Sequence, residues 1–134
     1  MTILSRILAP KEVKAILGVL DEADQRFDYP IFASIKKMIE EQVLSQSDAF
    51  AEKVRGGISA RQSAYSMIAN LAGDMAESGE FHVYRGVLNP VGGGEDLLRI
   101  YDAAVDEMLL IGAIDEDEAS EQKSSLRACI REMG

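Results

Sequence analysis

Apolar and polar residues alternate along most of the chain with the period of an α-helix, in five segments. The first segment runs from about residue 10 to 24, and its apolar stripe consists of Val13, Ile16, Leu17 and Leu20. The second begins near Pro30. Whether it continues through residues 45–48 to Val54 is left open, because the serines and the aspartate there compete for backbone hydrogen bonds.

The three remaining segments have clear helix signals at their ends. Ser59 and Gln62 are spaced as a capping box, which predicts a third helix from there to about residue 78. A fourth helix is expected to follow the glycines at 92–94 and to end at Gly112. The acidic run 115–118 predicts the start of a fifth helix, and so short a link makes the last two helices an antiparallel pair.

One segment departs from the helical pattern. Residues 80–90 are rich in aromatic and β-branched residues, which is typical of a strand, although the sequence offers no second strand to pair with it. It is expected to be either an extended loop laid over the helices or a strand that pairs with its own copy in a second subunit. The predicted fold is therefore mainly α: a single-domain helical bundle, residues 1–134, of about five helices with one extended or strand-like segment near 80–90.

The charge of the chain is concentrated in its second half. Residues 1–67 carry nine basic and nine acidic residues, whereas residues 68–134 carry five basic and fourteen acidic ones, which accounts for the net charge of −9. Because phosphate backbones bind to Lys and Arg, nucleic acid is not expected as a partner of this half, and no membrane partner is expected. The acidity favours solubility and could also complement a basic partner protein.

The supply of reactive side chains excludes several kinds of site. A single cysteine, Cys129, rules out an internal disulfide framework, and a single histidine, His82, rules out a carboxylate–histidine metal bundle. We therefore expect no metal, no cofactor and no identifiable catalytic residue. No apolar run reaches the roughly 20 residues of a membrane span, and a cytoplasmic location is expected.

Polar and aromatic groups that could bind a ligand gather in one place, in and near the extended segment. We name as candidate ligand or interface residues His82, Tyr84, Arg85, Asn89 and Tyr101. Such groups can donate or accept protons and bind anions. Three interpretations of the segment are open: a strap that packs on the bundle, a small-molecule or anion site, and an oligomer contact.

The leading functional hypothesis is a non-catalytic interaction or regulatory accessory protein, which either self-associates or meets a basic partner. The alternative is a protein, enzymatic or not, that binds a small molecule or an anion at a site between residues 80–90 and the helix that begins near residue 95. A third hypothesis, a DNA-binding regulator, depends on Lys53, Arg55 and Arg61 around a Gly-Gly turn.

Overall fold

The computed structural model describes the backbone of residues 6–78 and 93–133, and the side chains of these residues except those at 78, 93–95 and 129–133. Within these ranges every regular element is an α-helix and none is a strand. The helices are α2 (Lys11–Arg26), α3 (Pro30–Ser45), α4 (Ser47–Arg55), α5 (Ala60–Ser78), α7 (Gly93–Leu110) and α8 (Glu116–Met133). The predicted mainly α fold is confirmed, whereas the predicted extended segment at 80–90 lies outside the described residues.

The described residues form six helices where about five were predicted, because the second predicted helix is divided at Gln46. The Ser45 hydroxyl donates to the carbonyl oxygen of Gln42 over 3.0 Å, and Gln46 leaves helical geometry with φ −119° and ψ 34°. This is the competition of a serine side chain for backbone groups that the sequence indicated. The chain then resumes as α4, which buries Phe50 and Ala51.

The predicted helix ends are confirmed at three places. The backbone N–H of Gln62 donates to the Ser59 hydroxyl oxygen over 3.0 Å, and the N–H of Glu118 donates to Asp115 Oδ1 over 2.8 Å. Gly112, just after α7, has a φ of +80°, which side chains disfavour and which suits glycine at a helix end.

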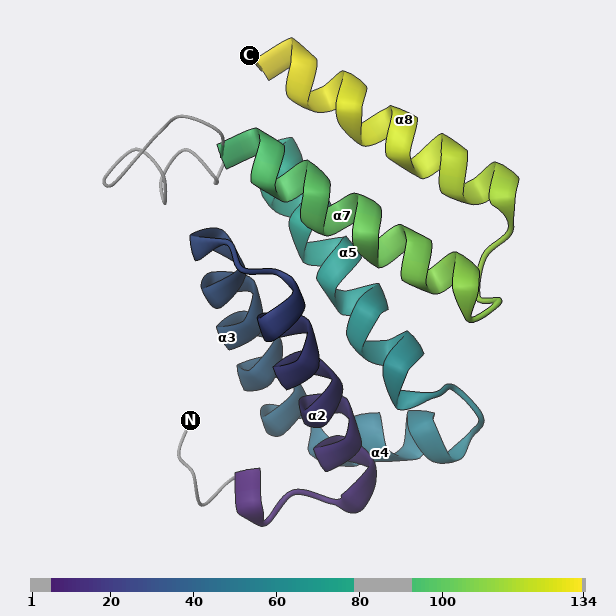
Figure 1. Cartoon of the computed structure of the whole chain (residues 1–134). Coiled ribbons are helices and arrows are strands. Elements are labelled where there is room, and N and C mark those ends of the chain that lie inside the picture. The colour runs from purple at the N-terminus through teal and green to yellow at the C-terminus, as the bar shows by residue number, and fades with distance from the viewer. Residues whose placement is uncertain (1–5, 79–92, 134) are drawn as a thin grey trace.

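Helices α5 and α7 lie in the middle of the molecule, with α2 and α3 on one side and α8 on the other (Figure 1). α7 contacts α3, α5 and α8, which makes it a central helix. Aromatic rings pack where α2, α3 and α5 meet. The ring centroids of Phe27 and Phe32 are 5.1 Å apart, and those of Phe27 and Tyr65 are 6.5 Å apart. The fully buried aliphatic side chains include Ile16, Leu17, Leu20, Ile35, Ile39, Ile68, Leu97 and Ile100.

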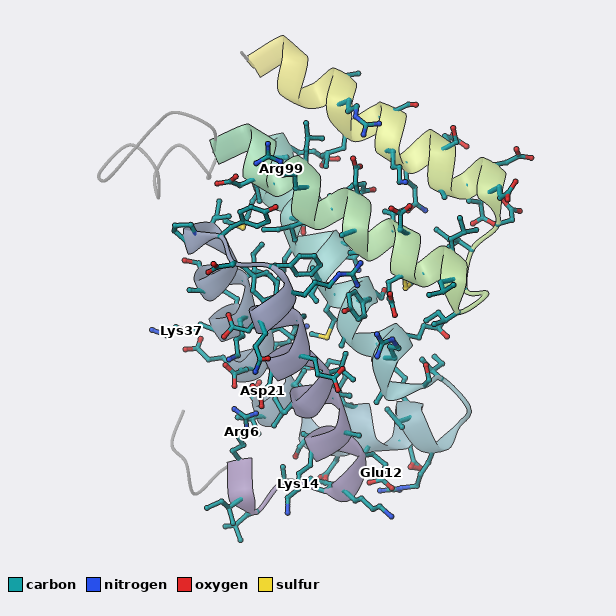
Figure 2. All side chains as sticks on the ribbon, in the orientation of Figure 1. Arg6, Glu12, Lys14, Asp21, Lys37 and Arg99 are labelled. Atoms are coloured by element: carbon teal, nitrogen blue, oxygen red, sulfur yellow. The ribbon has the colours of Figure 1, made fainter. Side chains whose placement is uncertain are left out.

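A short helical turn before α2 is tied to the body by Arg6. Its guanidinium lies 2.5 Å from an Asp21 carboxylate oxygen on α2 (Figure 2). It also lies 2.8 Å from a Glu40 carboxylate oxygen on α3. Lys36 on α3 also pairs with Asp21, at 3.3 Å. These ion pairs are partly exposed, so they position the turn more than they stabilise the fold.

Candidate functional site

Of the five predicted site residues, only Tyr101 falls in the described part of the chain. His82, Tyr84, Arg85 and Asn89 lie outside it, so their grouping with Tyr101 remains a prediction. Tyr101 is half-buried on α7 and lines a cleft between α5, α7 and α8. A tyrosine in a concave, partly polar cleft is a common feature of binding sites, and this cleft is the candidate site.

The cleft has a volume of about 380 Å³ and carboxylates on two of its three helices. We call it the acidic cleft; its lining residues are Gly73 and Glu77 from α5, Tyr101 from α7, and Glu118, Glu121, Gln122, Ser125 and Leu126 from α8. None of these lining residues is basic. The three glutamates give the cleft a negative potential that the rest of its lining does not neutralise.

The floor of the cleft is formed where α5 and α7 come close together. Gly73 has no side chain, and a Cβ atom at this position would lie 3.5 Å from Cε2 of the Tyr101 ring, an ordinary contact distance. Leu126 of α8 is 4% exposed and closes the third side. The cleft therefore combines an apolar and aromatic floor with an acidic rim, and such surroundings suit a cation with an extended carbon chain.

The rotation of α8 about its axis places the glutamates in the cleft. With 100° per residue, Glu118, Glu121 and Ser125 lie on one side of the buried Leu126, whereas Lys123 and Arg127 lie on the other. The basic side meets α7, where Lys123 pairs with Asp106, and Arg127 lies 2.5 Å from Asp102. On the side that faces α5, the cleft lining contains no basic residue that could pair with the glutamates.

The same charges act on the titration of neighbouring groups. Burial, and then the negative charges of Asp102 and Glu77, raise the pKa of Tyr101 above its usual value of 10.0. The phenol is therefore protonated at neutral pH and can donate a hydrogen bond into the cleft. Burial also raises the pKa of Asp102, against the lowering effect of Arg127 and Lys123.

The acidic residues of the cleft do not converge on one point. No group of three described His, Cys, Asp or Glu side chains is close enough to hold a metal ion. A calcium or magnesium site needs six or more oxygens around a single centre. The spread of the carboxylates instead matches a ligand whose positive charges are spread too, such as several basic side chains.

A second charged cluster, around Glu107 of α7, joins three helices. The Glu107 side chain is 7% exposed; it accepts hydrogen bonds from Arg61 of α5 and, over 3.3 Å, from Arg26 of α2. Arg26 also donates to the Tyr65 hydroxyl over 3.3 Å. Burial on its own would raise the pKa of Glu107, but its hydrogen bonds and charge interactions with Arg61 and Arg26 hold that pKa below 4.5. Arg61 also lies 3.6 Å from a carboxylate oxygen of Glu22 on α2, so that two carboxylates balance the two guanidinium groups and the cluster is structural.

Two of the three cations behind the DNA-binding hypothesis are engaged in the same way. Arg55 lies 3.0 Å from a carboxylate oxygen of Glu12 and 3.2 Å from one of Glu52, and Arg61 pairs with Glu107. These contacts neutralise charges that a phosphate backbone would need.

Sequence reasoning missed most of the acidic cleft and all of the Glu107 cluster. The excess of acid in residues 68–134 falls in the half of the chain that lines the cleft. In the sequence, the acids at 115–118 indicate only the start of a helix. Their spacing offered a further signal, since Glu118, Glu121 and Ser125 recur on one helix face.

Comparison with known protein families, curated proteins and solved structures gives no match. Among the described helices, none has a stretch long and apolar enough to cross a membrane.

Proposed function

We propose that this protein is a non-catalytic interaction or regulatory accessory protein that binds a lysine- or arginine-rich segment of a partner protein in the acidic cleft. One observation carries the proposal: three glutamates on two helices line a cleft of about 380 Å³ that has no basic lining residue. A basic segment would supply the missing positive charge, and complementary charge both accelerates association and selects the partner.

The apolar floor of the cleft favours a basic side chain, rather than a bare ion, as the ligand. Lysine and arginine carry apolar stems that pack against aromatic and aliphatic groups while their charged ends reach carboxylates. Here Tyr101 and Leu126 form the surface for the stem, and the glutamates form the rim. The cleft volume lies in the range of about 300 to 1,000 Å³ that is typical of ligand pockets.

Calorimetric titration with an octa-arginine peptide tests the proposal. We expect binding that weakens as salt rises from 50 to 200 mM, since the charges that make it are screened. The double variant Glu118→Gln/Glu121→Gln should bind about tenfold more weakly, because it loses two attractions of roughly 0.5 to 1 kcal/mol each.

The matched control is Glu41→Gln/Glu116→Gln, which removes the same charge from exposed positions outside the cleft, one of them in the first turn of α8. It should bind like the unmodified protein. Equal weakening by both double variants would contradict the proposal, and so would tight binding of octa-glutamate. Tighter binding of spermine than of octa-arginine would indicate a small-amine binder instead. The predicted self-association remains a separate prediction, which light scattering tests.

A further inference from the structure

One side of α8 is basic and faces acidic residues of α7, whereas its other side is acidic and faces an acidic residue of α5. Towards α7, the basic Lys123 and Arg127 meet the acidic Asp106 and Asp102. Towards α5, the acidic Glu118 and Glu121 share the cleft with the acidic Glu77. The charges of α8 are thus opposite to those that it meets on α7, and of the same sign as Glu77 on α5.

The apolar attachment of α8 is small in the part whose side chains are described. Among residues 116–128, only Ala119 and Leu126 are buried. Because this part of the helix buries so few apolar groups, its position depends strongly on the interactions along its edges. The electrostatic balance across the acidic cleft therefore influences how firmly α8 is held against α5.

We infer that a basic segment bound in the acidic cleft links α5 and α8 electrostatically, so that binding of the partner docks α8 more firmly. This inference rests on the proposed function. The positive charges of the segment would interact with Glu77 on α5 and with Glu118 and Glu121 on α8, replacing an unfavourable interaction between the two helices with attractions on both sides. The segment binds only while α8 is packed against α5. By mass action, binding therefore lowers the fraction of molecules in which α8 has moved away from α5.

A lysine built into α8 imitates such a ligand without any partner. Ser125 is exposed and lines the cleft, whereas its neighbour Ser124 is exposed outside it. A lysine at either position can pair with Glu121 along the helix, but only Ser125→Lys extends towards Glu77. We expect amide hydrogen exchange in α8 to slow about two- to fivefold in Ser125→Lys and to stay unchanged in Ser124→Lys.

Adding Glu77→Gln separates this electrostatic link from a local helix effect. If the new lysine joins the two helices, Glu77→Gln should remove most of the slowing in Ser125→Lys and change Ser124→Lys little. Equal exchange in the two lysine variants, or a gain that persists without Glu77, would overturn the inference.

The exchange of α8 in the complex completes the test. With octa-arginine at 100 times its dissociation constant, α8 amides that exchange by opening away from α5 should slow by up to about 100-fold. Peptide binding that is weakened by Glu118→Gln/Glu121→Gln but leaves α8 exchange unchanged would overturn the inference alone. Absence of peptide binding would overturn the proposed function and the inference with it.

Discussion

Replacing Glu118 and Glu121 with lysine should weaken octa-arginine binding by about 100-fold. Each replacement removes an attraction and adds a repulsion, and two such changes cost roughly 3 kcal/mol at low salt. The effect should exceed that of the glutamine variants and shrink as salt rises. Calorimetric titration of the purified variant in 50 mM salt measures it.

The control for this charge reversal is Glu41→Lys/Glu116→Lys. It makes the same change in net charge, and Glu116→Lys has the same unfavourable position near the positive end of the α8 dipole as Glu118→Lys. Neither residue lines the cleft. The control should therefore weaken binding only through the long-range field, by a fewfold. A loss in the control as large as that in the cleft variant would show that total charge, rather than the cleft, attracts the peptide.

Replacing Glu107 with alanine should lower the free energy of unfolding by about 2 to 3 kcal/mol. The change leaves Arg26 and Arg61 without the buried carboxylate that both contact, and removal of one member of a buried ion pair costs about 3 to 5 kcal/mol. We expect a smaller loss because each arginine side chain is 43% exposed and can be rehydrated. Urea unfolding followed by circular dichroism measures the difference.

The pH dependence of Glu107→Gln gives this prediction a second test. The pKa of Glu107 is lowered in the folded protein, so its charge stabilises the fold at pH values above the ordinary value of 4.5. That contribution is lost as the pH falls through the folded pKa. The stability gap between the unmodified protein and Glu107→Gln should therefore be full at pH 7 and shrink below about pH 4.5. The control variant Glu41→Gln, at an exposed position, should be as stable as the unmodified protein at both pH values. A stability gap for Glu107→Gln that grows on acidification would contradict the stabilising role of the Glu107 charge.

The sequence predicted the helices well because their signals are local. Ser59 with Gln62, and Gly112 after α7, mark helix ends through interactions that span only a few residues. The division at Gln46 could be suspected from Ser45 but not decided. A serine at this position can either bend a helix or end it, depending on how the residues that follow pack. Here the chain ends one helix and starts α4, which buries Phe50.

The candidate site was less accessible to sequence reasoning because it depends on how distant helices are oriented. Tyr101, a candidate ligand or interface residue from the sequence, lines the acidic cleft, and its role in a site stays a prediction. Glu118 and Glu121 could be placed on one face of a helix, but not opposite Glu77, since that requires the rotation of α8 against α5. Glu107 looked like any solvent-facing acid, because nothing local shows that Arg26 and Arg61 converge on it.

Amide chemical shifts recorded by NMR during titration with octa-arginine locate the bound peptide. If a basic segment binds in the acidic cleft, the largest changes should fall on Gly73, Glu77, Tyr101 and residues 118–126, with small changes on α3 and α4. The same titration of Glu118→Lys/Glu121→Lys should leave those resonances almost unmoved. Largest changes on α3 or α4, with the cleft resonances still, would contradict the cleft as the binding site.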